Sequence, residues 1–474
     1  MLDLDGQQQE ALYGLNLYRQ NMPSVSERIF CLCDQRVMKI LYVSQCYPPE
    51  TAPAGTRASE LGRYWVAKGH EVTVLTGFPN YPTGKVHPEY QSKFWRLCMM
   101  EDNNGVLVSR TWLIPLPNCK SWHRMLSFGS FTISAAIRGI FLRKPDIVIG
   151  TSPQLLVGLS GLAIAKRHGV PFVFEVRDLW PESLEAVGIS SHRSLLVRSL
   201  KGIAGLLYRK AAHIVVVTAP FKEHLERVWS VPSEKISVIV NGVDHHFLSP
   251  QSQTEEIARE FDMEGRFVVG YFGNIGNAHG IETLIEAADL LKATDTDIVF
   301  LVIGEGAEKE KLRRLVVEKR LSNIRVFPGQ PRSRIAGLIA AAHVCLVLLK
   351  NSELFKTVIP TKMLEFMSCG RPVIAAVSGE AARLLVEADA GVCVPPENAM
   401  AIAMAIRSLR SDAAWRTELG SNARKFIVEK LPREGTAREY LSLLQRLQRT
   451  NDNDEQIRQR EAPEEIANAG GGTR

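Results

Sequence analysis

The stretch VIPTKMLEFMSCGRPVI, residues 358–374, contains a helix start, a helix stop and the beginning of a buried strand. Pro360 favours the first turn of a helix, because its missing N–H needs no partner there. Gly370 stops the helix, since glycine readily adopts the left-handed conformation that follows a last turn. The apolar residues Val373 and Ile374 then begin an extended segment. A helix followed directly by a buried strand predicts one unit of a parallel α/β sheet.

The same alternation of helical stretches and short apolar runs extends in both directions along the chain. The runs are rich in Val, Ile and Phe and lack polar alternation, as strands buried on both faces do. Strands are predicted at 39–44, 71–77, 106–113, 146–151, 171–176 and 213–218, and again, after a polar stretch, at 267–272, 298–303, 324–327, 344–349, 372–377 and 391–394. This pattern predicts two doubly wound, Rossmann-like halves. Because such sheets bind ligands at the carboxyl ends of their strands, both halves are expected to face one cleft.

The pattern divides the chain into five parts. The two halves are expected at 38–244 and 245–430, followed by a C-terminal helix at 431–449 that packs back on the first half. The polar tail 450–474 is expected to lack regular structure. The sequence changes character at Met38, which suggests that the functional chain begins there and that 1–37 is an extension. A flexible native arm is the alternative.

The composition is that of a globular protein with buried cores. The chain has 474 residues, of which 45% are hydrophobic and 23% charged. Its net charge of +6 suits small polyanionic ligands or an anionic membrane surface and does not demand nucleic acid. No secretion signal is visible, and no uncharged apolar stretch reaches the length of about 20 residues that is needed to span a bilayer. The eight cysteines show no paired spacing typical of zinc sites, so a reduced cytoplasmic location is expected.

Two helical stretches are candidates for contact with a membrane surface. Residues 125–142 are apolar but are interrupted by Arg138, so they predict a surface helix that faces a membrane. Residues 192–210 are basic and place apolar side chains on one helical face. The alternative for 192–210 is an ordinary core-facing helix with a solvated basic face.

The helix start at Pro360 has the composition of a diphosphate site. Thr361, Lys362 and Met363 are expected to present free backbone N–H groups at the helix N-terminus, where anions are favoured. Lys362 adds a full positive charge, and Glu365 lies one turn later, where its carboxylate is placed to accept hydrogen bonds from ribose hydroxyls. The alternative is a capped helix with a solvated lysine and glutamate.

The segment PTKMLE (360–365) resembles the donor-binding helix of family 4 glycosyltransferases, which have the GT-B fold of two facing Rossmann-like domains. Four other segments resemble parts of that family in the same order along the chain: YPPETAPAG (47–55), NGVD (241–244), YFGNIGNAHGIETLIEAA (271–288) and VIGEG (302–306). In addition, EVRDLWPES (175–183) is similar to the bacterial subgroup that makes surface polysaccharides, including transferases of N-acetylated 6-deoxy sugars such as N-acetyl-fucosamine.

The resemblance implies transfer of a sugar from a nucleotide-sugar donor, UDP-linked, to a lipid-linked saccharide or polysaccharide precursor at the cytoplasmic face of the membrane. It implies retention of configuration, with no metal or other cofactor. The residues expected to bind the donor are Gly55, Gly273, Asn274, His279, Gly304, Glu305, Thr357, Thr361, Lys362, Met363, Leu364 and Glu365. The residues expected to be catalytic are Asp178, Arg177, Glu182 and Lys362. A structural Arg177–Asp178 pair is the alternative for that segment.

Four residues depart from the family pattern. Asn274 and His279 stand where the family usually has the Arg and Lys that clamp the diphosphate, although His279 is alternatively an ordinary loop histidine. Thr357 stands where a first glutamate is usual, and Thr151 replaces a histidine that often ends the fourth strand. Because a pyrophosphate leaving group needs positive charge or oriented dipoles, Lys362 and the nearby amides are expected to take over that role.

The sequence also argues against several other functions. Asp295-Thr296-Asp297 precedes an apolar strand instead of following one, which argues against a metal-binding Asp-x-Asp motif. Neither the dinucleotide spacing G-x-G-x-x-G nor a P-loop occurs, which argues against a dehydrogenase or an ATPase. Two alternatives remain open: a UDP-sugar 2-epimerase of the same fold, and a non-catalytic scaffold of a polysaccharide assembly complex.

Overall fold

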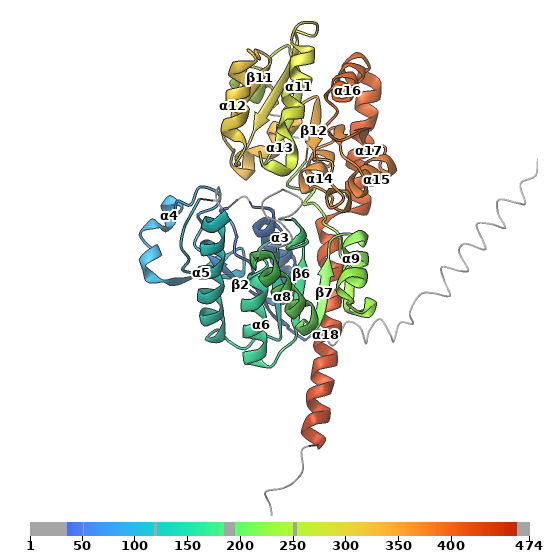
Figure 1. The fold of residues 1–474 in the computed structure, drawn as a ribbon. Helices are drawn as coiled ribbons and strands as arrows, with labels where there is room; N and C mark the ends of the chain where they lie inside the picture. The colour runs from blue at the N-terminus through green and yellow to red at the C-terminus, as the bar shows by residue number, and fades with distance from the viewer. Residues whose placement is uncertain (1–35, 51, 118–120, 184–194, 250–253, 462–474) are drawn as a thin grey trace, which may run out of the picture. The chain divides into compact units, whose positions relative to one another are not determined.

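The computed structural model describes residues 36–461 except for 51, 118–120, 184–194 and 250–253. From Lys39 onward, these residues form two sheets of largely parallel strands, each with helices on both faces (Figure 1). The architecture confirms the prediction of two Rossmann-like halves, which follows from runs of apolar residues that can be buried on both faces of a sheet.

The N-terminal sheet has the strand order β3-β4-β2-β1-β5-β6-β7-β8. Its strands are β1 (Lys39–Val43), β2 (Glu71–Gly77), β3 (Cys98–Asn103), β4 (Val106–Thr111), β5 (Ile147–Thr151), β6 (Phe172–Val176), β7 (His213–Val216) and β8 (Ile236–Val238). Its main helices are α3 (Pro53–Ala67), α5 (Ser121–Ile140), α6 (Val157–His168), α8 (Leu195–Lys210) and α9 (Ala219–Trp229).

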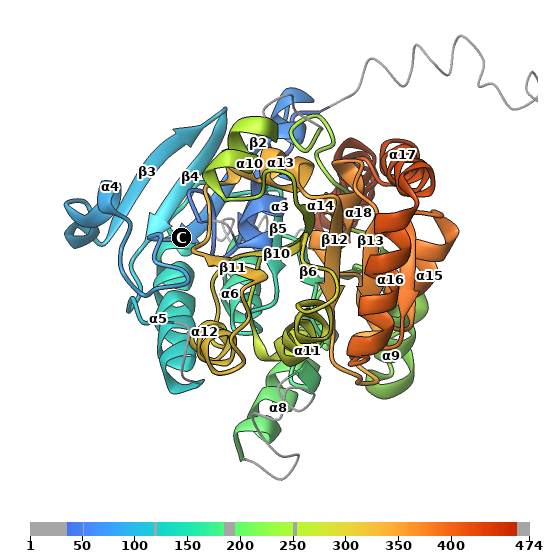
Figure 2. The same ribbon diagram turned by 90° about the horizontal axis from the view of Figure 1, so that it is seen from above.

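Two strands of this sheet are absent from the sequence prediction. One is the short edge strand β8. The other is β3, which pairs antiparallel with β4 at the opposite edge (Figure 2). The turn between β3 and β4 is Asn104-Gly105, and both residues have positive φ, 54° and 82°. Asn-Gly is the strongest short hairpin signal in a sequence, so β3 was predictable.

The C-terminal sheet is entirely parallel, with the order β11-β10-β9-β12-β13-β14. Its strands are β9 (Phe267–Phe272), β10 (Ile298–Ile303), β11 (Ile324–Phe327), β12 (Val344–Leu348), β13 (Val373–Ala376) and β14 (Gly391–Val394). Its helices are α10 (Thr254–Glu260), α11 (Ile281–Leu291), α12 (Lys309–Glu318), α13 (Arg332–Ala341), α14 (Thr361–Ser368), α15 (Glu380–Glu387), α16 (Ala399–Ser411) and α17 (Ala413–Lys430). Alternate residues of the central strand β9 enter two separate cores: Val268 packs on one face and Val269 on the other.

The last helix, α18 (Arg433–Glu461), packs against α3 of the N-terminal half. The indole N–H of Trp65 donates to the carbonyl of Ala437 at 3.0 Å, and the Tyr440 ring meets the Trp65 ring edge-on at 5.6 Å. The helix continues to Glu461, into the segment for which the sequence predicts no regular structure. Polar residues such as Glu, Gln and Arg are strong helix formers, so low hydrophobicity alone does not end a helix.

No helix in the described part of the chain is both long enough and apolar enough to span a bilayer. The predicted extension, residues 1–37, and the end of the tail lie almost wholly outside the described residues.

Candidate functional site

The donor-binding candidates of the C-terminal half gather at the carboxyl ends of β9 and β10. Gly273 follows β9 and Gly304 follows β10, and the two loops touch through their backbones. A Cβ atom at Gly304 would lie 1.8 Å from the carbonyl oxygen of Gly273, so only glycine permits this crossing. The N–H of Ile275 donates to the Glu305 carbonyl at 2.8 Å and holds the loops together. The two glycines therefore shape the floor of the site.

Lys362 is half-buried at the start of α14 and points back toward β9. Its Nζ donates to the Tyr271 hydroxyl at 3.1 Å and lies 4.2 Å from the centre of the Tyr271 ring. The Tyr271 hydroxyl donates in turn to the Asn274 carbonyl at 2.7 Å. Burial lowers the pKa of Lys362 to about 7, although Glu365 opposes this shift. Among the described residues no carboxylate forms an ion pair with Lys362; its neighbours are the Tyr271 ring and hydroxyl.

The N-terminus of α14 offers fewer free amides than the sequence predicts. The N–H of Met363 donates to the Pro360 carbonyl at 3.0 Å, which corrects the expectation that it is free for a ligand. A tight first turn uses that donor internally. The N–H groups of Thr361 and Lys362 make no hydrogen bond to another described residue. The side chains of Met363 and Leu364 are buried in the core and hold the helix in place.

His279 and Asn274 do not supply the missing positive charge. His279 hydrogen-bonds through Nδ1 to the carbonyl of Leu348 at 3.1 Å, and its ring meets Tyr271 edge-on. Burial, together with the nearby charge of Lys362, lowers the pKa of His279 to about 3, so the ring is neutral. The Asn274 side chain is exposed. Neither His279 nor Asn274 therefore adds positive charge beside Lys362.

Glu305 and Thr357 contribute to the support of the site. The Glu305 carboxylate accepts from the Lys309 ammonium at 2.8 Å and from the Gly329 N–H at 3.1 Å. These bonds keep its pKa low against the opposing effect of burial. The Thr357 hydroxyl donates to Leu354, while the Thr357 carbonyl accepts from the Thr218 hydroxyl of the N-terminal half at 2.9 Å.

Glu365 belongs to an ion network that the sequence did not reveal. Arg332 at the start of α13 lies 3.5 Å from Glu365 through one guanidinium nitrogen and 2.7 Å from Glu60 of α3 through the other. The second oxygen of Glu60 accepts from Arg433 at 2.6 Å. Burial raises the pKa of Glu365, and Arg332 opposes that effect. Arg332 lies 33 residues from Glu365, and Glu60 lies 272 and 373 residues from Arg332 and Arg433, so no local pattern could have found these contacts.

The N-terminal half carries a fully buried ion pair at the end of β6. Arg57 of α3 donates to Glu175 at 2.9 Å, and both side chains are at most 1% exposed. The hydroxyls of Tyr42 and Thr151 donate to the other carboxylate oxygen at 2.5 and 2.6 Å. Burial alone would raise the pKa of Glu175, but Arg57 and these donors hold it below its usual range. A carboxylate inside an apolar strand was the sequence signal for such a partner.

Arg177 and Asp178 follow directly at the strand end. The Ser152 hydroxyl oxygen accepts from both of their backbone N–H groups, at 2.7 and 3.3 Å. Among the described residues these two side chains form no ion pair with each other, which counts against the alternative of a structural pair. The Nε and Nη1 atoms of Arg177 are buried without a hydrogen-bond partner in the structure. Burial raises the pKa of Asp178 to about 6, while its hydrogen bond from Ser183 lowers it.

Glu182 and Gly55 each make contacts within the fold that explain why these residue types occupy their positions. One Glu182 oxygen lies 3.2 Å from His224 and 3.3 Å from the Trp229 indole nitrogen, so α9 holds this carboxylate. A Cβ atom at Gly55 would lie 2.9 Å from the Tyr47 backbone, so Gly55 lets α3 pack on that loop. Their roles toward a donor or acceptor stay predictions.

The Asp295 and Asp297 carboxylates face arginines. Arg407 lies 2.9 Å from Asp295, and Arg410 lies 2.7 Å from Asp297. Ion pairing thus accounts for both carboxylates of the Asp-x-Asp triplet. Within the described ranges, no three His, Cys, Asp or Glu side chains are grouped so that they could hold a metal ion.

Helix α5 carries a stripe of exposed apolar side chains, hereafter the α5 stripe, which continues just past its end. The members are Trp122, Leu126, Ile133, Ile137 and Phe141, each between 46% and 77% exposed. By contrast, Leu200 and Leu207 of α8 are buried in the core, which supports the core-facing alternative for that helix. The membrane-facing candidate is therefore α5.

Comparison with known proteins identifies both halves. Residues 54–247 match the family described as Glycosyltransferase Family 4, and residues 252–426 match the family described as Glycosyl transferases group 1. WcaI of Escherichia coli K12, a glycosyl transferase named for colanic acid biosynthesis, is 26% identical over 423 residues, which cover 85% of this chain and 99% of WcaI. WbjE of Pseudomonas aeruginosa, a glycosyltransferase, is 25% identical over 56% of this chain and 66% of its own.

Solved structures share the fold. Sucrose-phosphate synthase from Thermosynechococcus elongatus superposes with a TM-score of 0.69 at 20% identity, covering 86% of this chain and 98% of its own. Anabaena HepE, solved with UDP and glucose, has a TM-score of 0.65 at 17% identity, covering 86% and 99%. Taken with the two family matches and the two Rossmann-like sheets, these likenesses show that the chain belongs to the family 4 glycosyltransferases of the GT-B fold.

Proposed function

We propose that the protein transfers a sugar from a UDP-linked donor to a lipid-linked or polysaccharide precursor, with retention of configuration. The observation that carries the proposal is Lys362, a half-buried cation without a carboxylate partner among the described residues, at a helix N-terminus beside two free amides. Such an arrangement favours a diphosphate. Glu365, one turn later, is the group proposed to accept from the ribose hydroxyls.

In the proposed reaction the sugar–phosphate bond breaks while the acceptor hydroxyl attacks from the same face of the sugar. The leaving diphosphate takes the proton of that hydroxyl, so no protein base is required. The protein's contribution is to stabilise the charge that develops on the diphosphate and to position the two reactants. The Lys362 ammonium stabilises that charge, together with the backbone amides of Thr361 and Lys362. Arg177 and Asp178 at the end of β6 are proposed to orient the acceptor or the donor sugar.

Relatives support the donor and the pathway class. HepE has been solved with UDP, with UDP and glucose, and with UDP-glucose, and WcaI is named for colanic acid biosynthesis. A UDP-sugar and a surface polysaccharide such as O-antigen or capsule are the corresponding proposals for this chain. The resemblance of EVRDLWPES (175–183) favours an N-acetylated 6-deoxyhexose as the transferred sugar.

The acceptor proposal rests on the α5 stripe. Exposed apolar side chains on one helical face, followed by the exposed basic residues Arg143 and Lys144, suit the interface of an anionic membrane. We therefore place the protein at the cytoplasmic face of the membrane, where a lipid-linked saccharide is within reach.

The first experiment compares Lys362→Met with Lys319→Met, which removes an exposed lysine paired with Asp289. Each chain is incubated with a panel of UDP-sugars and a lipid-linked acceptor extract, and product is followed by mass spectrometry. We expect turnover to fall about 10²–10³-fold in Lys362→Met and to be unchanged in Lys319→Met. Equal turnover in both variants would contradict the proposed role.

Two further measurements distinguish the transferase from an epimerase and from a non-catalytic scaffold. Isomerisation of a UDP-sugar with no acceptor present would identify an epimerase. Absence of UDP binding by calorimetry at millimolar nucleotide would favour a scaffold. Either result would replace the transferase proposal.

The second experiment tests the membrane contact. Ile133→Ser/Ile137→Ser is compared with Val317→Ser/Val386→Ser, which removes apolar residues that are at least as exposed, on α12 and α15. Flotation with vesicles containing anionic lipid should show about tenfold weaker binding for the α5 variant and no change for the control. Equal flotation of both would contradict the placement of α5 on the membrane.

A further inference from the structure

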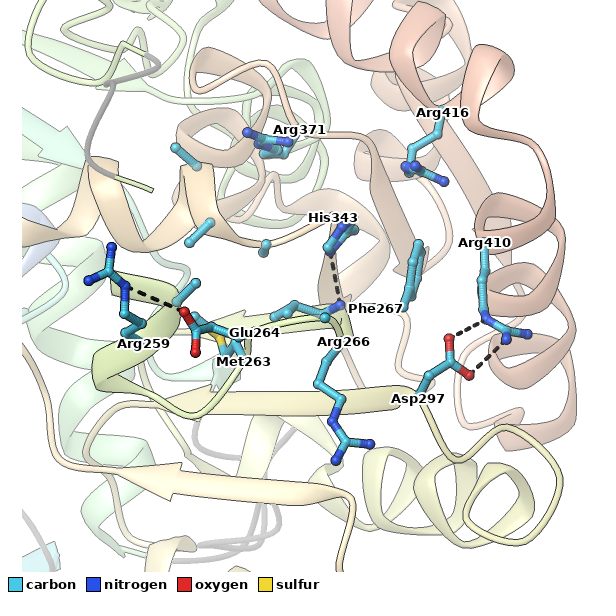
Figure 3. A pocket seen from close by; sticks show the side chains of 16 residues that line it. Arg259, Met263, Glu264, Arg266, Phe267, Asp297, His343, Arg371, Arg410 and Arg416 are labelled. Atoms are coloured by element: carbon cyan, nitrogen blue, oxygen red, sulfur yellow. Dashed lines mark hydrogen bonds and ion pairs between the residues drawn. The ribbon is translucent and has the colours of Figure 1, made fainter. Parts of the chain in front are cut away.

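A second polar site lies at the opposite edge of the C-terminal sheet from Lys362. It is a cavity of about 840 Å³ at the amino ends of β9 and β12 (Figure 3). Phe267 opens β9, His343 precedes β12 and Arg371 precedes β13, and all three line the cavity. Arg410 of α16 and Arg416 of α17 complete one wall. The cavity shares no residue with the donor-binding candidates.

The lining carries a surplus of positive charge. Its charged members are Arg259, Arg266, Arg371, Arg410, Arg416, Glu264 and Asp297. Arg259 lies 3.4 Å from Glu264 and Arg410 lies 2.7 Å from Asp297, so two ion pairs account for both carboxylates (Figure 3). Three guanidinium groups remain without a carboxylate partner in the described part of the chain. Like charges gathered in a hollow favour a multivalent anion there.

Arg371 and Arg416 are the best placed of the three. The Nε atom of Arg371 is buried and has no hydrogen-bond partner in the structure. Burial lowers the pKa of Arg371, and the charge of Arg416 contributes to that shift. One Arg416 nitrogen donates to the Leu409 carbonyl at 2.6 Å, and its guanidinium stacks over the Phe267 ring at 5.3 Å. The Arg416 fork is thus held by these two contacts, and the buried Nε of Arg371 is a donor without a partner in the structure.

His343 adds a neutral donor to the same wall. Its Nδ1 accepts from the Val268 N–H at 3.0 Å, so the ring proton is on Nε2. The ring is stacked on Phe267 at 4.9 Å. Burial lowers the pKa of His343 to about 4, and the charges of Arg416 and Arg371 add to the effect. The imidazole therefore remains an uncharged N–H donor at neutral pH.

We propose that this cavity is a binding site for a small phosphorylated molecule, with Arg371 and Arg416 holding the phosphoryl oxygens and His343 donating to them. The guanidinium groups of Arg371 and Arg416 match a phosphoryl group of about two negative charges, and the fork geometry of arginine fits phosphoryl oxygens in pairs. The remaining wall is apolar, formed by Met263, Val268 and several alanines, and offers contact for the uncharged part of such a molecule. The volume is within the range of small-molecule sites.

The test measures pyrophosphate binding by calorimetry in chains that all carry Lys362→Met, so that the donor site is disabled in every sample. Arg371→Gln/Arg416→Gln is compared with Arg313→Gln/Arg314→Gln, which removes two arginines of α12 outside the cavity. Citrate at equal ionic strength is the second ligand. Arg416→Gln alone serves as the test variant if the double variant fails to fold.

We expect pyrophosphate to bind the unaltered cavity, the cavity variant to bind at least tenfold more weakly, and the α12 control to differ by less than twofold. Three results would overturn the proposal: no binding of millimolar pyrophosphate to the unaltered cavity, equal binding by the cavity and control variants, or equal affinity for citrate. None of them bears on sugar transfer, because Lys362 is replaced in every sample.

Discussion

The two halves of the molecule use charge differently near the carboxyl ends of their sheets. At the end of β6, Glu175 is neutralised by Arg57 and by two hydroxyl donors, and the cluster is sealed from solvent. At the carboxyl end of the other sheet, Lys362 has a tyrosine ring and hydroxyl as neighbours instead of a carboxylate. The first cluster satisfies its charges within the fold. The second has no carboxylate among the described residues and is the proposed diphosphate site, so the first should govern stability and the second binding.

The largest effect is expected from breaking the buried pair. Arg57→Met leaves Glu175 as an unpaired charge in the core and should lower the free energy of unfolding by about 3–5 kcal/mol. Arg57→Met/Glu175→Gln removes both charges and should be more stable than Arg57→Met alone. Urea unfolding of the three chains gives the comparison. If Arg57→Met/Glu175→Gln were less stable than Arg57→Met, the unpaired charge of Glu175 would not be the cause of the lost stability.

An intermediate effect is expected from the pH dependence of UDP binding. Because the pKa of Lys362 in the free protein is about 7, its positive charge is present below that pH and is lost as the pH rises through it. The affinity for UDP should therefore weaken from pH 6.5 to 9, by up to about tenfold per unit above pH 7. Lys362→Arg, which stays charged over this range, is the control and should give a flatter profile in calorimetric titrations. Parallel profiles for the two chains would assign the titration to another group.

The smallest effect is expected from the link between the two halves. Arg332→Gln removes the contact to Glu365 and one of the two contacts to Glu60. Since Arg332 is about a third exposed, the loss of stability should be about 1 kcal/mol or less. The donor KM should rise about three- to tenfold with little change in kcat, because Glu365, the carboxylate proposed to bind the ribose, is less well held. Arg334 lies on α13 with Arg332 and pairs with Glu260 of α10; Arg334→Gln breaks that surface pair and should leave the donor KM unchanged.

The sequence predicts the architecture well because both sheets are built from continuous apolar runs. The bounds of α14 could also be predicted, since Pro360 and Gly370 mark its limits locally; Gly370 has the positive φ of 68° that a helix end favours. The antiparallel strand β3 was missed although its Asn104-Gly105 turn is a local signal.

The sequence could not predict which polar and charged side chains contact one another when they lie far apart in the chain. Glu60 meets Arg332 and Arg433 across 272 and 373 residues, and Lys362 meets Tyr271 across 91. No periodicity or spacing encodes such contacts. The free N–H predicted for Met363 failed for a related reason, because the choice between a ligand and the Pro360 carbonyl is decided by the geometry of one turn.

The chain crosses between its two halves twice, and the two crossings are bonded side by side. The N–H of Val243 donates to the Leu431 carbonyl at 2.9 Å, and the N–H of Arg433 donates to the Val243 carbonyl at 2.8 Å. The joint is thus a short two-stranded ladder rather than a single tether. A torque on one half must twist both strands together, which restricts swivelling about the connection more than a lone linker would. A protease that cuts one crossing would still leave the other to join the pieces.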